Sequence, residues 1–226
     1  MNITNLSTPE EHVNKAIDIL STMPSSDYLL MLSGGSTPIS LYNHLSFSFN
    51  FPFPKDIALI DERWGNFSQH ENSNELVVKS TGLLGRIRWE KSGFHPILSL
   101  KPTTPAAEAA AYEKELEQLF EVYRGKVVAI MGMGENGHIA GILPNSEGMD
   151  TNKLFVSYES GDKYGTRLTS TAMAILEHFS KIILLLNNEE KYGVFQRLME
   201  FESDARKYPA LILRDVPNLE VLTYVE

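Results

Sequence analysis

One histidine stands in a glycine-rich segment that directly follows an apolar run. The segment Gly132–His138 reads GMGENGH, and the preceding run, Lys126–Met131, is typical of a buried strand. A neutral imidazole is well suited to take a proton from water near neutral pH, so His138 is a candidate general base. The alternative interpretation is a histidine that caps a helix or packs in the core.

The glycine spacing in this segment also fits two nucleotide-binding motifs, and we reject both. Gly132, Gly134 and Gly137 have the G-x-G-x-x-G spacing of a dinucleotide site, but Pro144 would cut short the helix that such a site needs. The segment nearly fits a P-loop, except that His138 stands where the phosphate-binding lysine should be.

Two further polar segments follow predicted strands. Ser33–Pro38 (SGGSTP) offers two glycines, two hydroxyls and a helix start, which together favour a phosphate; the alternative is a plain turn with a helix cap. Asp61–Arg63 (DER) places two carboxylates and a guanidinium after a buried-type strand, although such a triplet is more often a solvated turn.

Alternating strands and helices must position these segments. Helices are predicted to start near Ser7–Glu11, to lie around Ile39–Leu45, and to span Pro105–Tyr123 and about Glu189–Glu202. Strands are predicted at Tyr28–Leu32, Ile57–Ile60, Lys126–Met131 and Ile182–Leu186, and more weakly at Ala210–Leu213 and Val221–Tyr224. The stretch from residue 66 to Pro102 has an irregular pattern, and no element is assigned there.

This alternation indicates an α/β fold with a mostly parallel sheet, in which ligands bind at the carboxyl ends of the strands. No linker or repeat divides the chain, so we expect a single domain over residues 1–226.

Composition narrows the possible functions. The 226 residues are 42% hydrophobic and 22% charged, which is ordinary for a globular protein. The absence of cysteine excludes disulfides, a thiolate nucleophile and Cys-based metal sites, and the six histidines form no ligand pair, so no metal is expected. The net charge of −9 argues against nucleic acid and anionic membranes as partners. With no signal-like or membrane-spanning apolar run, we expect a cytoplasmic protein.

Four motifs in order resemble the 6-phosphogluconolactonase family across nearly the whole chain. They are SGGSTP at Ser33–Pro38, DER at Asp61–Arg63 followed by Ser73-Asn74, GMGENGH at Gly132–His138, and RLTSTAMAIL at Arg167–Leu176. The resemblance implies a Rossmann-like three-layer α/β sandwich of the sugar-phosphate isomerase and lactonase type. It also implies hydrolysis of 6-phosphogluconolactone in the pentose phosphate pathway, with no cofactor, by a monomer or small homo-oligomer.

The resemblance assigns roles to particular positions. Gly34, Gly35, Ser36 and Thr37 would hold the sugar phosphate, with Arg167 and Lys191 supplying positive charge. His138 would be the catalytic base, supported by its loop through Gly134, Asn136 and Gly137, while Asp61 and Arg63 would line the sugar end of the pocket.

One position departs from the family pattern, and it keeps other interpretations open. The family usually has Asp-Gly-His, whereas this chain has Asn136-Gly137-His138. If that carboxylate orients the imidazole, Asn136 could stabilise the wrong tautomer; if it only holds the loop, an amide suffices, and we favour the second interpretation.

Two alternative functions are an amino-sugar phosphate isomerase/deaminase and a non-catalytic sugar-phosphate sensor. The deaminase branch has a glutamate where this chain has Leu143 and generally a tyrosine where it has Arg63, so both residues favour the lactonase. The sensor is supported only by Asn136.

Overall fold

Seven strands form one parallel sheet, and three more form a small antiparallel sheet beside it. The computed structural model describes residues 1–65, 70–99 and 103–224. The order of the large sheet is β1-β10-β9-β6-β2-β3-β5, and that of the small sheet is β4-β8-β7. The strands are β1 (Asn2–Leu6), β2 (Leu29–Leu32), β3 (Asp56–Leu59), β4 (Asp61–Arg63), β5 (Gly93–His95), β6 (Val127–Gly132), β7 (Phe155–Glu159), β8 (Thr166–Ser170), β9 (Lys181–Leu186) and β10 (Leu219–Tyr224).

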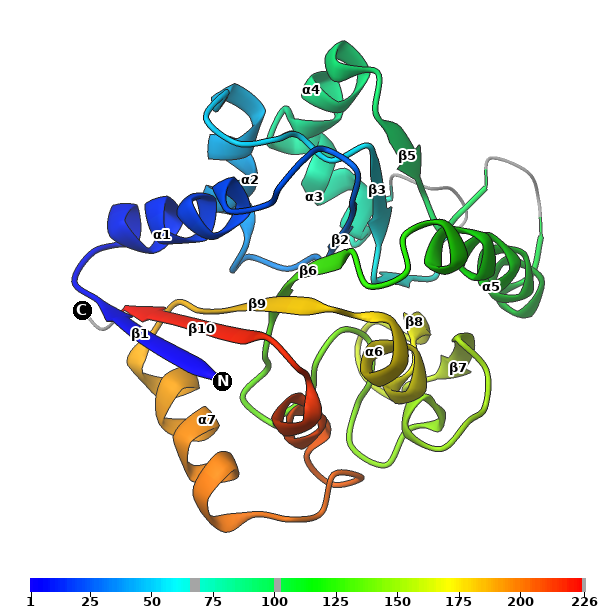
Figure 1. The fold of residues 1–226 in the computed structure, drawn as a ribbon. Helices are drawn as coiled ribbons and strands as arrows, with labels where there is room; N and C mark the ends of the chain where they lie inside the picture. The colour runs from blue at the N-terminus through cyan, green and yellow to red at the C-terminus, as the bar shows by residue number, and fades with distance from the viewer. Residues whose placement is uncertain (66–69, 100–102, 225–226) are drawn as a thin grey trace.

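Helices cover both faces of the large sheet. In Figure 1, α1 and α2 lie on one side of it, and α6 and α7 lie on the other. The α-helices are α1 (Pro9–Ser21), α2 (Ile39–Phe47), α3 (Asn74–Ser80), α4 (Leu83–Glu90), α5 (Pro105–Val122), α6 (Ala172–His178) and α7 (Glu189–Phe201), with 3₁₀ helices η1 (Glu147–Met149) and η2 (Pro209–Asp215). The expected three-layer α/β architecture is confirmed. No helix in the described part of the chain is long and apolar enough to cross a membrane.

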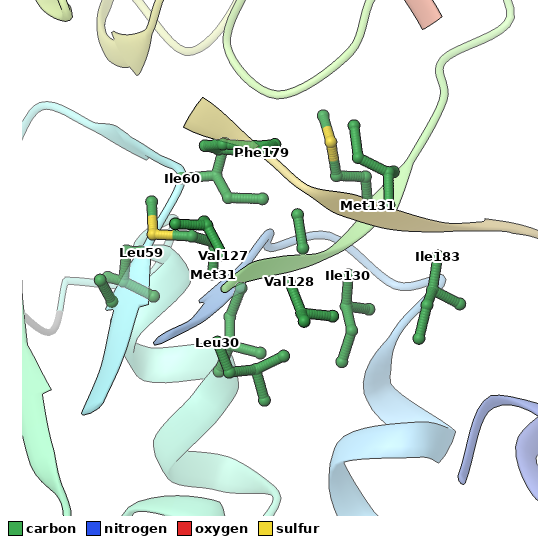
Figure 2. Close-up of a cluster of buried hydrophobic side chains, with 14 of the residues drawn as sticks. Leu30, Met31, Leu59, Ile60, Val127, Val128, Ile130, Met131, Phe179 and Ile183 are labelled. Carbon is green, nitrogen blue, oxygen red and sulfur yellow. The ribbon is translucent and has the colours of Figure 1, made fainter. Parts of the chain in front are cut away.

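The central strands are buried on both faces, which explains why they were predictable. Every residue of β2 is buried, as are nearly all of those in β6 and β9. Side chains from β2, β3, β6 and β9 pack together above and below the sheet, as Figure 2 shows for Leu30, Leu59, Ile130 and Ile183. A parallel strand covered on both sides reads as a continuous apolar run, and all four runs match their strands to within a residue at each end.

Local end signals also correctly located the long helices. Thr8 caps α1, because its side-chain oxygen accepts a hydrogen bond from the Glu11 N–H at 3.1 Å. Thr104 caps α5 in the same way through the Ala107 N–H at 3.2 Å.

Two predicted segments were wrong. Ala210–Leu213 is not a strand but part of η2, which starts at Pro209 and is buried throughout that run. The Ala210 N–H donates to the Gly137 carbonyl at 2.8 Å, so the apolar run is explained by packing under the histidine loop rather than by sheet pairing. Asp61–Arg63 is not a loop; it forms β4, antiparallel to β8.

Other elements were missed altogether. They include β1, β7, β8 and α6, together with α3, α4 and β5, which lie in the stretch that showed no regular pattern. Within that stretch, residues 66–69 and 100–102 lie outside the described residues.

A histidine between two carboxylates ties the edge strand β5 to its neighbours. His95 Nε2 lies 2.8 Å from Asp56 Oδ1 on β3, and Nδ1 lies 2.6 Å from Glu115 Oε1 on α5. Burial by itself would lower the pKa of His95, but the hydrogen bonds to Glu115 and Asp56 outweigh it and raise the pKa above its ordinary value. The protonated ring can donate to both carboxylates at once.

We therefore expect His95 to stabilise the fold in a pH-dependent way. Because its folded-state pKa is raised, its contribution is fully present below about pH 6.5, where an unfolded histidine titrates, and is lost as pH rises through the folded-state value. His95→Gln should lower Tm by about 2–4 °C more at about pH 5.5 than at about pH 9, measured by calorimetry.

The exposed Asn43 on α2 provides the control, because Asn43→Gln changes no ionisable group and should change Tm similarly at both pH values. An equal loss of Tm at both pH values for His95→Gln would contradict the ionic role.

Candidate active site

A polar cavity lies at the carboxyl ends of β2, β3 and β6. Its volume is about 490 Å³. It is lined by residues 33–37, Asp61, Arg63, residues 132–136, His138, Ala140 and Lys191. The parallel register aligns Leu32 of β2 with Leu59 of β3 and with Ile130 of β6, so the loops that follow these strands leave the sheet at one level. All three polar segments singled out in the sequence therefore meet in one place.

The SGGSTP loop approaches its surroundings so closely that glycine is required. A Cβ on Gly34 would lie 1.7 Å from Asn74 Oδ1, and Gly35 has a left-handed backbone with φ of 82°. The loop therefore packs directly against Asn74 and exposes its backbone and hydroxyls to the cavity.

Lys191 reaches this loop from the start of α7. Asn188 caps the helix by accepting the Lys191 N–H at 2.8 Å, which turns the side chain toward the loop. The Lys191 Nζ donates to Thr37 Oγ1 at 2.9 Å and to Asn187 Oδ1 at 3.2 Å. Burial lowers the pKa of Lys191, and nearby Glu135 opposes that shift. A half-buried cation beside a glycine loop is well placed to bind an anion.

The imidazole of His138 is held by its own loop. Gly134 must lack a side chain, because a Cβ there would lie 2.1 Å from His138 Cε1. The Gly134 N–H also donates to the His138 carbonyl at 2.9 Å, which closes the loop. Gly137 adopts φ of 78° and supplies the turn between them.

The side-chain amide of Asn136 determines which nitrogen of His138 carries the proton. Asn136 Oδ1 accepts the backbone N–H of His138 at 3.2 Å, and the same oxygen lies 2.6 Å from His138 Nδ1. A backbone N–H can only donate, so the amide must present its oxygen, and Nδ1 must then be the donor to that oxygen. In neutral His138, Nε2 is left with the free lone pair that a general base needs.

The electrostatic surroundings keep His138 neutral. Burial lowers its pKa to about 4, and the charges of Arg167, Arg63 and Lys191 act in the same direction against the opposing effect of Asp162. Near neutral pH the ring is therefore unprotonated and can accept a proton.

Asp61 and Arg63 enter the cavity from β4. Asp61 is almost fully buried, and Asn74 Nδ2 donates both to its carbonyl at 2.8 Å and to its Oδ2 at 3.1 Å. Burial raises the pKa of Asp61, while Arg63 and Arg167 oppose the shift. Arg63 Nη1 donates to the Asn72 carbonyl at 2.9 Å.

Arg167 contacts the turn between β7 and β8, and its expected role at the phosphate stays a prediction. It is absent from the cavity lining, its side chain is only 4% exposed, and its Nη2 donates to Asp162 Oδ2 at 2.5 Å. In the antiparallel pair it stands directly opposite Arg63. The structure thus groups Arg167 with Arg63, and Lys191 with Thr37.

Sequence reasoning assigned no individual role to several groups around the cavity. Glu62 accepts backbone N–H bonds from Arg63, Asn74 and Glu75, which anchors the start of α3 beneath the site. Ala140 has a left-handed backbone, with φ of 51°, on the cavity wall. Asn74 was noted only as part of a resemblance, and no local pattern marked Asp162.

Among the described residues, two that line the cavity have a buried polar atom without a hydrogen-bond partner, namely Ser33 Oγ and Arg63 Nε. Asn74 Oδ1 and Arg167 Nε are also buried without such a partner. Such atoms are uncommon in folded proteins. In the described part of the chain, no three His, Asp or Glu side chains gather as metal ligands would.

Comparison with known proteins agrees with this arrangement. A model of the family "Glucosamine-6-phosphate isomerases/6-phosphogluconolactonase" matches residues 10–221. A 6-phosphogluconolactonase from Nostoc sp. is 26% identical over 200 residues, covering 86% of this chain and 80% of the relative. One from Thermotoga maritima is 29% identical over 190 residues, covering 82% and 79%.

Solved structures share the fold. A 6-phosphogluconolactonase from Shewanella baltica OS155 superposes with a TM-score of 0.85 at 23% identity and covers 100% of this chain and 98% of its own. A monomeric glucosamine-6-phosphate deaminase superposes with a TM-score of 0.72 at 22% identity, covering 99% and 97%. The fold is therefore common to both kinds of protein, and the site must distinguish them.

The contact between Asn136 and His138 leads to a direct test by NMR titration of the imidazole. Asn136→Asp places a carboxylate against Nδ1 and should raise the pKa of His138 by about 1–3 units, because an adjacent negative charge favours the imidazolium. Glu135→Gln, one residue earlier in the loop, is the control and should leave that pKa nearly unchanged. An unchanged pKa in Asn136→Asp would show that the contact with Nδ1 does not form.

Proposed function

The chain belongs to the glucosamine-6-phosphate isomerase/6-phosphogluconolactonase family, and on that premise we propose that it hydrolyses 6-phospho-D-glucono-1,5-lactone to 6-phosphogluconate. The observation that carries this proposal is the position of His138. Asn136 holds it as a neutral base between Arg63 and the glycine loop with its neighbouring Lys191. A site of this kind can bind a phosphate at one end and activate water at the other.

The proposed reaction needs one base that later serves as an acid. Nε2 of His138 takes a proton from water as the water oxygen bonds to C1 of the lactone. The tetrahedral intermediate then collapses, the bond from C1 to the ring oxygen breaks, and the imidazolium gives its proton to that oxygen. The products are a hydroxyl group and a carboxylic acid, which ionises at neutral pH.

Different charged groups bind the two ends of the proposed substrate. We assign the phosphate to residues 34–37 and Lys191, and the oxygen that becomes negative at C1 to Arg63. Asp61, Arg63 and Arg167 then lie at the lactone end, with Gly134, Asn136 and Gly137 supporting His138. Binding of an anionic substrate also offsets the cations that depress the pKa of His138, which makes the base stronger once substrate is present.

The structure gives less support to isomerisation or deamination. Isomerisation moves a proton between neighbouring carbons, and the resemblance to the deaminase branch implies a glutamate at position 143 that supports the histidine. Here Leu143 stands there, with its backbone N–H donating to the Tyr158 hydroxyl at 3.2 Å. Leu143 and Asn136 together replace two carboxylates that the deaminase branch would use.

The domain organisation, the location in the cell and the oligomeric state belong to the same proposal. One continuous apolar core runs from Val13 to Leu222, which supports a single domain over residues 1–226. A cytoplasmic location, the independence from cofactors and metals, and a monomer or small homo-oligomer stay predictions.

Removing the proposed base tests the reaction directly. His138→Gln should lower kcat on 6-phosphogluconolactone by about 10²–10⁴, because that is the usual contribution of a general base. The assay must resolve turnover above the spontaneous hydrolysis of the lactone. Wild-type turnover in His138→Gln would exclude the role of His138, whereas a wild type that binds 6-phosphogluconate without turnover would be a sensor.

Removing the cation at the glycine loop tests the phosphate end. Lys191→Met should raise KM for the phosphorylated lactone by about 10–100-fold, because a charge-assisted hydrogen bond to the phosphate is lost. It should have little effect on hydrolysis of the unphosphorylated lactone. Lys126→Met, at the amino end of β6, is the charge-matched control and should leave KM unchanged. Equal effects on both lactones would contradict a phosphate role.

A further inference from the structure

The tip of the β7–β8 hairpin is a tight turn that is held by its own hydrogen bonds. Residues 160–165 join the two strands, which Figure 1 shows beside α6. The Ser160 N–H donates to the Gly165 carbonyl at 3.1 Å, and the Gly165 N–H donates to the Asp162 carbonyl at 3.1 Å. Gly161 and Gly165 have φ of 71° and 68°, which lets the turn close.

The two carboxylate oxygens of Asp162 have different hydrogen-bond partners. Its Oδ1 accepts the Ser160 hydroxyl at 2.7 Å and the Tyr164 N–H at 2.8 Å, so the carboxylate is anchored by the turn. Its Oδ2 accepts Arg167 Nη2 at 2.5 Å. An anchored carboxylate holds the guanidinium of Arg167 in one orientation.

Tyr164 joins both arginines of the site. The guanidinium carbon of Arg63 lies 5.0 Å from the centre of its ring, and that of Arg167 lies 4.8 Å from it. Both distances fall within the range of a cation–π interaction, which is strongest where water is excluded. The Nζ of the exposed Lys163 also lies 4.9 Å from the ring centre, so the ring contacts three cations, of which Arg63 and Arg167 belong to the site.

These cations would otherwise repel each other. Arg63 and Arg167 are directly opposite on β4 and β8, and like charges in that position destabilise a sheet. Arg167 is almost fully buried, so leaving its charge without partners would be costly. The hairpin tip supplies a carboxylate to Arg167 and an aromatic ring to both arginines.

We propose that Asp162 and Tyr164 are positioning residues, which hold Arg63 and Arg167 beside His138 so that Arg63 meets the oxygen that becomes negative during lactone hydrolysis. The inference rests on the proposed function. It adds to the site the turn between β7 and β8. This turn lies outside the four sequence motifs, the last of which begins at Arg167.

A pair of substitutions at Tyr164 separates the ring from the fold. Tyr164→Leu removes the aromatic platform and should lower kcat by about 10–100-fold, because a misplaced donor no longer stabilises the transition state. KM and the inhibition constant for inorganic phosphate should change by less than about twofold, since the phosphate end is untouched. Tyr164→Phe keeps the ring and should retain kcat, and Lys153→Gln, an exposed residue ahead of β7, is the control for removing a positive charge outside the tip.

A substitution at Asp162 tests the other contact. In Asp162→Asn the remaining Oδ1 can still accept the Ser160 hydroxyl and the Tyr164 N–H, so the turn is kept while the ion pair with Arg167 is lost. The expected result is again a fall in kcat with an unchanged inhibition constant for phosphate, and Tm within about 4 °C of wild type.

The outcomes distinguish the two proposals. If wild type shows no hydrolysis above the spontaneous rate, the proposed function fails and this inference fails with it. If wild type is active and Tyr164→Leu keeps its kcat, only the positioning role fails. A rise in KM and in the phosphate inhibition constant at unchanged kcat would also overturn it, because the arginines would then serve the phosphate.

Discussion

The parallel pairing of β2, β3, β6 and β9 is the constraint on which the site depends. Parallel strands all end at the same edge of a sheet, and the chain that follows each of these strands carries polar residues at that edge. The SGGSTP loop, the DER strand, the histidine loop and Lys191 are about 30 to 150 residues apart in sequence and still line one cavity. The apolar core between the layers holds these strand ends in register, so the positions of the polar groups follow from the packing of Leu, Ile and Val beneath them.

Positively charged side chains gather at the cavity, although the net charge of the chain is negative. The protein carries −9, yet Arg63, Arg167 and Lys191 gather around His138 and lower its pKa. Fields near a site are set by the closest charges, because more distant exposed charges are screened within about 10 Å. The global charge therefore argues against polyanionic partners without arguing against a small phosphate. Burial and the nearby cations together keep His138 unprotonated, and the same cations would attract a phosphorylated substrate.

The amide at position 136 shows how a departure from a family pattern can be accommodated. An asparagine could in principle present either end to the imidazole, and the wrong end would leave the proton on Nε2. The backbone N–H of His138 removes that freedom, because it requires an acceptor. The tautomer suited to a base is therefore kept without a carboxylate, which the sequence alone left undecided.

The sequence by itself determined the buried parallel strands and three of the helices, because apolar runs, helix caps and acidic residues in the first turn are local signals. β2, β3, β6 and β9 are apolar runs, and α1, α5 and α7 begin at residues whose side chains accept the first free N–H groups. The sequence also identified His138 and residues 34–37 as candidates, because glycines spaced in this way after a predicted strand can be recognised without the structure.

Only the tertiary structure decided the rest. β1 is an exposed edge strand with polar residues, and it is defined by its pairing with β10. Ala210–Leu213 has the apolar content of a strand but folds as η2, because its backbone bonds to the histidine loop instead of a neighbouring strand. Asp162 and Tyr164 carry no motif, and their part in the site follows from β8 placing Arg167 opposite Arg63. Pairing between distant segments depends on which surfaces meet after folding, and no short stretch of sequence contains that information.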